Sequence, residues 1–334
     1  MPGRPNALLV MDHDTYVAHF DAARLDRLRG LVTPAWTADL DSPAARRHLA
    51  RAEVLLTSWG APGLTAERLD AAPALRAVFH AAGSVRALVS DDLWRRGIAV
   101  TSAADANAVP VAEFTLAAVI FAGKKAPFLA ADPVARQRGW AHHAGFGDLS
   151  NYRRTIGVVG FSRIGRRVVR LLDCLRPVRR LVADPYADPA EVARAGAEPV
   201  PLKDLLTRSD VLTLHAPETP GTRGMIGARE LALLPDHATV INTARGSLVD
   251  TDALAAECRD GRLFAILDVT DPEPLPDDHP LRSMPNVMIT PHVAGSLGSE
   301  ILRLTDSALD ELARWTAAQP LRFAVTPETL PFSA

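Results

Sequence analysis

The chain has 334 residues, of which 48% are hydrophobic and 23% are charged, and this composition is typical of a soluble globular protein. Lys and Arg total 37 against 39 for Asp and Glu, so the formal net charge of -2 gives no indication of a nucleic-acid partner. No apolar run approaches the roughly 20 residues that span a bilayer, so we expect no membrane partner. The length predicts two domains.

Other features of the sequence predict a cytoplasmic protein. The first residues, MPGRPNALLVMDHD, have no secretory apolar stretch because Asp12 interrupts it. Cys174 and Cys258 lie far apart and form no CxxC pair, as is usual for a reducing compartment. His142 and His143 are adjacent, but no third ligand has a suitable spacing, so we predict no metal site.

The first half of the chain alternates short apolar runs with helical stretches. Helical periodicity is clear at 21–30, and 111–123, VAEFTLAAVIFAG, is an apolar helix that we expect to pack against another domain or subunit. The polar segment 124–154, which includes Trp140, is predicted to be an irregular connecting arm. The predicted strands are 7–11, 52–60, 74–83 and 97–103.

The second half is the most regular part of the chain. Short apolar strands that alternate with helices predict a parallel, doubly wound α/β sheet. After Gly298, residues 300–318 form a predicted amphipathic helix. The predicted strands are 155–160, 179–184, 210–214, 238–242, 263–269 and 286–290.

The stretch TIGVVGFSRIGRRVVR, 155–170, resembles a nucleotide-binding strand, turn and helix, except that Ser162 replaces the middle glycine. Gly160 permits the tight bend, and Gly165 permits close packing of helix on strand. Ser162 adds only a small side chain, and its hydroxyl can bond a phosphate oxygen. The amides that begin the following helix offer an anion site, so we predict that the turn holds a dinucleotide.

An acidic residue about 20 positions later strengthens that prediction. Asp184 ends the strand RRLVAD, where a carboxylate binds the ribose hydroxyls of the cofactor. Because a carboxylate repels a 2′-phosphate, NAD is favoured over NADP. The nearby Arg179 and Arg180 make this preference a moderate one.

Three further motifs each follow a predicted strand, where open α/β sheets bind their ligands. Arg245 lies in INTARGSLVD (241–250), Asp268 and Glu273 in LDVTDPEPLP (267–276), and His292 in MITPHVAGS (288–296). Hydride transfer from a hydroxyl needs a base, for which histidine suits neutral pH. A neighbouring carboxylate would orient the imidazole, and an arginine can grip a substrate carboxylate with two hydrogen bonds.

Each of these residues also has a simpler interpretation. Arg245 could be a surface arginine, Glu273 a solvated acid and His292 a helix-capping histidine. Their common placement after strands of one sheet makes such a coincidence improbable. Together they predict a site for a 2-hydroxyacid or a 2-oxoacid.

These motifs, NTARG, LDV, EPL and TPH in that order, resemble the D-isomer-specific 2-hydroxyacid dehydrogenase family over about residues 50–300. The resemblance implies that His292 is the general acid and base, Glu273 its partner, and Arg245 the group that binds and polarises the substrate. Asp268 would contact the nicotinamide carboxamide, and His215 would be structural. The implied cofactor-binding residues are Gly160, Ser162, Arg163, Ile164, Gly165, Asp184, Ala216, Pro217, Thr243, Ala244 and Asp268.

The same resemblance implies two Rossmann-like domains with doubly wound parallel sheets. The segment NAVPVAEFTLA (107–117) resembles the entry to the nucleotide domain, where a long helix and an arm pair two subunits of a homodimer. The substrate domain would be discontinuous, with residues 1–106 plus 299–334, and the NAD-binding domain would span 107–298.

The predicted substrate loop departs from the family pattern G-x-G-x-D-N, because this chain has HAAGSVRALVS at 80–90. Backbone amides at Ala82, Gly83, Ser84 and Val85 can still bind a carboxylate. Trp59 could project into the cleft and favour an apolar or aromatic tail over a phosphate, or it could pack between the domains. The chain's end at 334 also leaves little room for an added regulatory domain, so phosphoglycerate is not the expected substrate.

We therefore predict an NAD-dependent oxidoreductase that interconverts a 2-oxoacid and a D-2-hydroxyacid, similar to glyoxylate or hydroxypyruvate reductases or acting on a bulkier 2-oxoacid. Two alternatives remain open. One is a non-catalytic NAD-sensing interaction protein on the same fold, and the other is a formate- or phosphite-type dehydrogenase.

Overall fold

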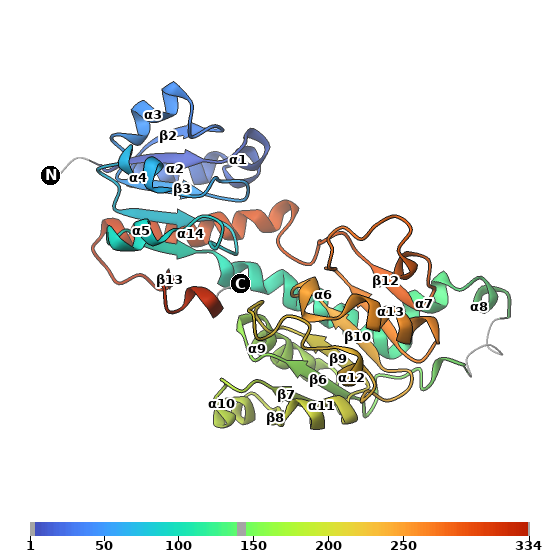
Figure 1. Ribbon diagram of the computed structural model, residues 1–334. Helices are drawn as coiled ribbons and strands as arrows, with labels where there is room; N and C mark the ends of the chain where they lie inside the picture. The colour runs from blue at the N-terminus through green and yellow to red at the C-terminus, as the bar shows by residue number, and fades with distance from the viewer. Residues whose placement is uncertain (1–3, 139–144, 333–334) are drawn as a thin grey trace. The chain divides into compact units, whose positions relative to one another are not determined.

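The computed structural model describes residues 4–138 and 145–332. The chain is divided into two compact units, each with its own sheet (Figure 1). Unit 1 comprises Met1–Asn107 and Ser296–Ala334, and unit 2 comprises Ala108–Gly295. The boundaries expected from the sequence fall after residues 106 and 298. Each unit thus has a doubly wound α/β sheet, and the predicted fold class is confirmed.

Unit 1 contains a six-stranded sheet in the order β13-β5-β4-β3-β1-β2. Only β13 runs antiparallel to its neighbour. The strands are β1 Asn6–Val10, β2 Thr33–Thr37, β3 Val54–Thr57, β4 Ala77–His80, β5 Ala99–Ser102 and β13 Ala324–Val325. The helices are α1 His13–His19, α2 Ala22–Leu31, α3 Pro43–Leu49, α4 Ala66–Asp70, α5 Asp91–Arg95 and α14 Ile301–Thr316.

Two apolar layers fill unit 1, one on each face of its sheet. Leu309 and Leu312 of α14 pack with Phe79 of β4 on one face. On the other face, Leu93 of α5 packs with Val78 of the same strand. Because side chains alternate across a strand, successive residues of one strand face different layers. The C-terminal helix therefore completes the core of the unit that the N-terminal segment begins.

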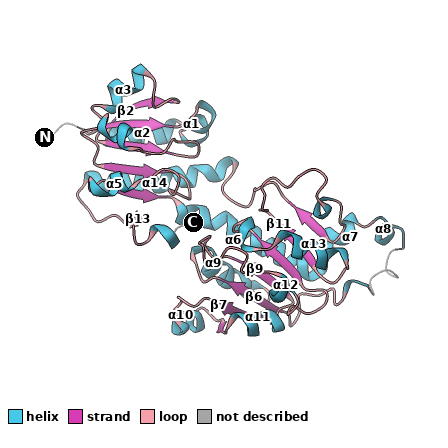
Figure 2. Ribbon diagram, in the orientation of Figure 1, coloured by secondary structure: helices cyan, strands magenta, loops and turns pink. Residues whose placement is uncertain are grey.

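Unit 2 contains a seven-stranded sheet in the order β12-β11-β10-β9-β6-β7-β8, in which all the pairings are parallel (Figure 2). The strands are β6 Thr155–Val159, β7 Arg179–Ala183, β8 Glu198–Pro199, β9 Val211–Leu214, β10 Thr239–Asn242, β11 Phe264–Leu267 and β12 Val287–Ile289. The helices are α6 Ala104–Lys124, which begins in unit 1, α7 Ala126–Ala131, α8 Pro133–Arg138, α9 Arg163–Leu171, α10 Pro189–Arg194, α11 Leu202–Arg208, α12 Ala228–Leu231 and α13 Thr251–Arg259.

Helices cover both faces of this sheet. Residues of α6, α9 and α10 pack with Ile156 and Val158 of β6 on one face. Residues of α11, α12 and α13 pack with Leu212 and Leu214 of β9 on the other. Gly157 lies close to α11, since a β-carbon there would stand 2.1 Å from Ser209 Oγ. The parallel strands buried on both sides explain the continuous apolar runs in the sequence.

Helix α6 is longer than the sequence analysis predicted. Its 21 residues are apolar enough, by length and composition, to cross a membrane, so the expectation that no such run exists was wrong. Half of its most apolar window is nevertheless buried inside the structure. Ala112, Val119 and Ala122 belong to the core of unit 2. These contacts are typical of a core helix.

The segment 124–154 is more regular than predicted. It contains α7 and α8, and Phe128 of α7 is 1% exposed and contacts Phe264 of β11 with 4.9 Å between ring centroids. The prediction of an irregular arm was therefore wrong for its first part, because a periodic pair of short helices was read as polar loop. Trp140, His142 and His143 lie outside the described residues.

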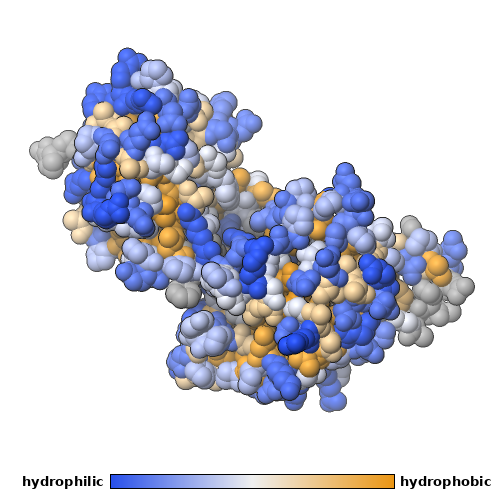
Figure 3. Space-filling model, in the orientation of Figure 1, coloured by the Kyte–Doolittle hydropathy of each residue, from blue (hydrophilic) through white to orange (hydrophobic). Residues whose placement is uncertain are grey.

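Hydrophilic side chains cover most of the face shown in Figure 3, and apolar residues appear there in separate patches. This surface agrees with the charged fraction of the sequence, 23%. Single exposed apolar residues are normal on a folded protein.

Candidate functional site

The carboxyl ends of the parallel strands in unit 2 meet at one edge of the sheet, and most of the predicted site residues follow them. Sheet order reverses between β6 and β9, and such a switch point is where open α/β sheets bind their ligands. The glycine turn follows β6, Asp184 follows β7, and His215 and Ala216 follow β9. The segments after β10, β11 and β12, three neighbouring strands, carry Arg245, Glu273 and His292.

Gly160 and Gly165 have the steric roles that a dinucleotide-binding turn requires. Gly160 has φ of 93°, in the left-handed region, and a β-carbon there would lie 2.6 Å from the amide nitrogen of Ala216. A β-carbon at Gly165 would lie 2.0 Å from the carbonyl oxygen of Gly160. Neighbouring backbone segments therefore approach the turn so closely that only glycine fits these two positions.

Ser162, at the middle position, caps helix α9. Its Oγ accepts a hydrogen bond of 3.3 Å from the amide of Gly165. Its backbone is extended, with φ of -70° and ψ of -174°, a conformation that any residue adopts. The position does not need glycine, and the hydroxyl satisfies one of the first amides of the helix. Arg163 and Ile164 begin that helix, with Arg163 exposed.

Asp184 lies against the glycine turn. Its Oδ2 accepts from the amide of Phe161 at 2.7 Å, and its Oδ1 accepts from the amide of Tyr186 at 2.9 Å. These bonds hold the half-buried carboxylate at the end of β7, beside the glycine turn. Each carboxylate oxygen can accept a further hydrogen bond.

Arg179 and Arg180 do not lie near Asp184, as the sequence analysis assumed. They begin β7 and Asp184 follows its end, so the strand separates them by roughly 13 Å or more at 3.3 Å per residue. Arg180 Nη1 donates to Asp173 at 2.5 Å and to the carbonyl of Val169 at 3.0 Å. Neither arginine has a hydrogen bond with Asp184 among those of the described residues.

The structure brings His292 and Glu273 together. Nδ1 of His292 lies 2.7 Å from Oε1 of Glu273, and the two side chains are 53% and 40% exposed. Since an ionised carboxylate can only accept, Nδ1 carries the proton, and Nε2 is left for another partner. This is the arrangement of a histidine that exchanges a proton through Nε2 and is oriented through Nδ1.

The backbone that carries His292 is held in an uncommon conformation. His292 has φ of 54° and follows Pro291, a left-handed geometry that costs free energy in a residue other than glycine. Asp268 stabilises it: the carboxylate accepts from Thr290 Oγ1 at 2.6 Å and from the amides of Val293 and Ala294 at 2.8 and 2.9 Å. The Asp268 side chain, 2% exposed, therefore acts first as the support of the histidine loop.

Arg245 shares this edge of the sheet but is half-buried. Its Nη1 donates to the carbonyl of Ala244 at 2.6 Å. The carbonyl of Arg245 accepts from Nδ2 of Asn242 at 2.8 Å, which fixes the turn after β10. The structure thus joins His292 to Glu273 directly and places Arg245 on the adjacent strand end.

The other predicted cofactor residues line the same edge. Thr243 is 6% exposed and its Oγ1 lies 2.9 Å from that of Thr115 on α6, so the hydroxyl is engaged in packing. Ala244 and Ala216 are buried, and Pro217 is half-buried. His215 is 3% exposed, and burial lowers its pKa to about 3. A histidine so far from protonation fits a structural role.

The predicted substrate residues all lie in unit 1, at the carboxyl ends of β3 and β4. Ala82 and Val85 are buried, a β-carbon at Gly83 would lie 3.4 Å from Nδ2 of Asn107, and Ser84 is partly exposed. Trp59, two residues after β3, is 41% exposed, so part of its side chain is open to solvent.

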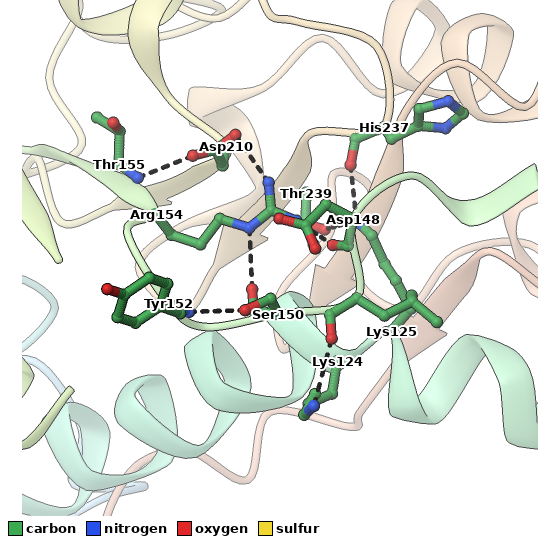
Figure 4. Close-up of polar contacts among 11 residues, drawn as sticks. Lys124, Lys125, Asp148, Ser150, Tyr152, Arg154, Thr155, Asp210, His237 and Thr239 are labelled. Atoms are coloured by element: carbon green, nitrogen blue, oxygen red, sulfur yellow. Dashed lines mark hydrogen bonds and ion pairs between the residues drawn. The ribbon is translucent and has the colours of Figure 1, made fainter. Parts of the chain in front are cut away.

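Some polar clusters have no signal in the sequence. His19, on α1, contacts Ser58 and Thr305, residues 39 and 286 positions away, and no motif or spacing relates them. At the edge opposite to the cofactor turn, Lys125 Nζ donates to the carbonyl of His237 at 2.7 Å and to Thr239 Oγ1 at 2.6 Å (Figure 4). This lysine lines a cavity of about 90 Å³. Among the described residues no group of three or more could hold a metal ion.

A doubly wound parallel sheet, a glycine turn at its switch point and an acid at the end of the next strand define unit 2 as a dinucleotide-binding domain. Residues 119–294 match the family model for the D-isomer specific 2-hydroxyacid dehydrogenase, NAD binding domain. The chain belongs to this family, so the resemblance and the NAD cofactor predicted from the sequence are confirmed.

Individual relatives agree with that assignment. The chain is 35% identical to the D-3-phosphoglycerate dehydrogenase of Mycobacterium tuberculosis over 297 residues, 87% of this chain and 53% of that protein. It is 34% identical to the glyoxylate reductase of Aeropyrum pernix, covering 73% of this chain and 74% of that protein. A solved phosphoglycerate oxidoreductase from Rhizobium etli aligns with a TM-score of 0.78 and 28% identity, over 96% of this chain and 98% of that one. The chain spans about half the length of the D-3-phosphoglycerate dehydrogenases that it matches.

Proposed function

We propose that the chain is an NAD-dependent oxidoreductase that interconverts a 2-oxoacid and a D-2-hydroxyacid. The observation that carries this proposal is the His292–Glu273 pair, 2.7 Å apart at the same sheet edge as the glycine turn. A half-exposed, oriented imidazole beside a dinucleotide site supplies what oxidation of a hydroxyl needs: a base within reach of the departing proton.

The residues present fit the cofactor. Gly160 and Gly165 leave a cradle that a β-carbon would fill, the first amides of α9 suit the pyrophosphate, and Asp184 suits the ribose hydroxyls. NAD, when bound, supplies the hydride acceptor for oxidation and, as NADH, the donor for reduction. The carboxylate at Asp184 disfavours the additional phosphate of NADP.

The chain's own groups would then handle charge and protons. Arg245 would bind the substrate carboxylate and polarise the carbonyl, since a guanidinium can form two parallel hydrogen bonds. Nε2 of protonated His292 would give its proton to the carbonyl oxygen during reduction and take it back during oxidation. Glu273 holds the ring in the tautomer that this exchange requires and stabilises the imidazolium. Asp268 supports the loop that carries the histidine.

Unit 1 would bind the rest of the substrate. Backbone amides of residues 82–85 would bind its carboxylate, and Trp59 would contact its tail. An exposed indole favours a short or apolar tail, as in glyoxylate, hydroxypyruvate or a bulkier 2-oxoacid, over a phosphate. In this region Arg86 donates to the carbonyl of Pro331 at 2.6 Å. That bond engages a guanidinium that would otherwise suit a phosphate.

The chain would form a homodimer in the cytoplasm. Helix α6 exposes an apolar stripe on the side away from the core, with Phe121 49% exposed and Ala117 exposed one turn earlier. Together with α7 and α8, this stripe offers a surface that a second copy would cover. Equilibrium sedimentation would report a mass of about twice 35.8 kDa, whereas a monomer would contradict this part of the proposal.

A panel of 2-oxoacids tests the function. NADH and NADPH are compared side by side with glyoxylate, hydroxypyruvate, phosphohydroxypyruvate, and branched and phenyl 2-oxoacids. We expect NADH oxidation with at least one unphosphorylated acid and a clear preference for NADH. Turnover of no 2-oxoacid would favour an NAD-sensing protein. NADH production from formate or phosphite would favour a formate- or phosphite-type dehydrogenase.

A further inference from the structure

A buried histidine in unit 1 joins three separate segments of the chain. His19, the last residue of α1, is 0% exposed. Its Nδ1 lies 2.7 Å from Oγ1 of Thr305 on α14, and its Nε2 lies 2.7 Å from Oγ of Ser58, directly after β3. Both ring nitrogens are thus engaged by hydroxyls, and the imidazole acts as a bridge between the last helix and the end of a strand.

The hydrogen bonds define which nitrogen carries the proton. Thr305 Oγ1 donates to the carbonyl of Ile301 at 3.3 Å, so it accepts from Nδ1–H of His19. Nε2 is then the acceptor, and the Ser58 hydroxyl donates to it. Burial lowers the pKa of His19 to about 4, which agrees with a neutral ring near pH 7. The donors therefore run in one direction, from the Ser58 hydroxyl through the imidazole to Thr305 Oγ1.

Ser58 lies between the two segments to which we assign substrate binding. Trp59 is the next residue, and its ring centroid lies 6.1 Å from that of His19. Ser58 Oγ also stands 3.5 Å from the carbonyl of Ala81, the first residue after β4. One side chain therefore touches the base of both the Trp59 loop and the loop of residues 81–85.

A second histidine reinforces the same region. His80 ends β4, is 4% exposed, and its Nδ1 lies 2.9 Å from Thr57 Oγ1 on β3. Burial lowers its pKa to about 4, with a further lowering from His19, while a hydrogen bond with the backbone of Ser84 raises it. The two strand ends and the loops that follow them are thus tied to each other by two neutral imidazoles.

A purely structural role would not need this arrangement. Burying polar groups costs free energy unless every hydrogen bond is made, and an apolar side chain would fill the same space without that cost. What a hydrogen-bonded network provides and an apolar side chain does not is a single fixed geometry for Ser58. Because Ser58 directly precedes Trp59, a fixed position of Ser58 also fixes where the partly exposed indole of Trp59 begins.

We infer that His19 is a positioning residue that, through Ser58, fixes Trp59 and residues 81–84 in the geometry that selects the tail of the 2-oxoacid, with preference for an apolar or aromatic tail. The selection of the substrate's tail rests on the proposed function, whereas the fixing of Trp59 and residues 81–84 through Ser58 does not. His19 touches neither substrate nor cofactor and acts through Ser58.

Two matched variants separate positioning from stability. Ser58→Ala removes the donor to Nε2, beside the substrate loops, and Thr305→Val removes the acceptor of Nδ1, on α14. Each deletes one hydrogen bond of the same imidazole, so both should lower Tm by a similar amount, about 2–4 °C. We expect S58A to raise KM for a phenyl or branched 2-oxoacid about tenfold with a smaller change in kcat, and T305V to change KM less than twofold.

Hydrogen exchange provides a readout that needs no substrate. In S58A the amides of residues 58–60 and 81–84 should exchange several-fold faster than in T305V, with NADH affinity the same in both. Equal exchange in the two variants, or equal changes in KM, would overturn the inference. A wild type that reduces no 2-oxoacid would overturn the proposed function and the tail selection, while the exchange comparison would still decide whether the hydrogen bond between His19 and Ser58 positions the loops.

Discussion

In unit 2 the strands begin at one edge of the sheet and end at the other, and both edges carry basic and acidic side chains. At the beginning edge, Lys125 is 3% exposed and Arg154 donates to the carbonyl of Ser150 and to Asp210 (Figure 4). Asp210 also accepts from the amide of Thr155 at 2.8 Å. Lys125 Nζ lies 4.0 Å from the centroid of the Phe264 ring. These charges bind neighbouring chain segments together.

At the ending edge the His292–Glu273 pair is open to solvent. His292 and Glu273 are about half exposed and bond each other, and among the described residues no hydrogen bond occupies Nε2 of the histidine. The two edges are built from the same strands with the same packing. They differ in their hydrogen bonds. At the beginning edge Lys125 donates to groups of the chain itself, whereas at the ending edge Nε2 of His292 is available to another molecule.

The two edges show which polar groups of such a sheet can take part in a reaction. A buried lysine that donates to two neighbouring groups stabilises the fold, because its removal leaves those polar atoms without a partner. An oriented pair with one open nitrogen can exchange a proton with another molecule. Variants at the two edges should therefore divide cleanly into losses of turnover and losses of stability.

The largest effect is expected at the ending edge. His292→Ala should lower kcat by about 10³-fold, since general acid and base catalysis contributes roughly 10²–10⁴. NADH affinity should stay within twofold, because the glycine turn and Asp184 are intact. Steady-state kinetics and fluorescence titration with NADH measure the two quantities. His48→Ala, at an exposed histidine of unit 1, is the matched control; near-normal turnover of H292A would remove the assigned role.

The opposite edge should respond in stability. Lys125→Ala leaves the carbonyl of His237 and the buried Oγ1 of Thr239 without a partner, so unfolding should become easier by about 3 kcal/mol in urea titrations. Turnover below the melting range should stay within twofold. Lys124→Ala, at the adjacent exposed lysine, should cost less than about 0.5 kcal/mol. A large loss of kcat in K125A would erase the distinction between the two edges.

The same lysine gives a test by pH. Burial lowers the pKa of Lys125 from 10.5 to about 7. Between these values the unfolded chain binds more protons than the folded one, so the free energy of unfolding should rise with pH from about 7 to 10.5. The rise should be absent in Lys125→Met. Urea denaturation at several pH values compares the two slopes, and parallel curves would show that this lysine does not titrate as expected.

Glu273 should have a smaller effect than His292. In Glu273→Gln the amide oxygen can still accept from Nδ1–H, but the negative charge that stabilises the imidazolium is lost. We expect kcat to fall about tenfold, which corresponds to about 1.4 kcal/mol. Asp271→Asn changes an acid of the same loop that pairs with Arg223 at 2.8 Å, and should leave kcat nearly unaltered. A greater loss in D271N than in E273Q would place the important charge elsewhere.

The sequence predicts strands and the residues that follow them, but it does not predict contacts between segments that are far apart in the chain. The apolar runs at 155–160 and 263–269 contain β6 and β11, because strands buried on both faces leave continuous signals. β2 is missed since TPAWT has a proline and only partial burial. His292 and Glu273 were found because both follow strands, whereas Lys125, His19 and Thr305 depend on packing between segments that no spacing relates.

The smallest effect is expected at Ser162, where the nucleotide motif departs from its usual glycine. The residue has extended backbone, so glycine is not required there, and its hydroxyl caps α9. Ser162→Gly should therefore lose only a few tenths of a kcal/mol, and Ser162→Ala about 1 kcal/mol, because glycine is tolerated at a cap better than alanine. Thermal unfolding of the wild type, S162G and S162A would rank their stabilities.

Cofactor affinity decides what the serine does beyond capping. If the hydroxyl only caps the helix, NADH should bind S162G within twofold of the wild type, since the first amides of α9 and the carboxylate of Asp184 remain. A tenfold weakening in S162G and S162A alike would mean that the hydroxyl bonds the pyrophosphate. Tighter binding by S162G alone would mean that the serine side chain crowds the phosphates. Ser162 would then resemble His292, whose backbone is strained and whose side chain is exposed, rather than Asp268, which supports the histidine loop.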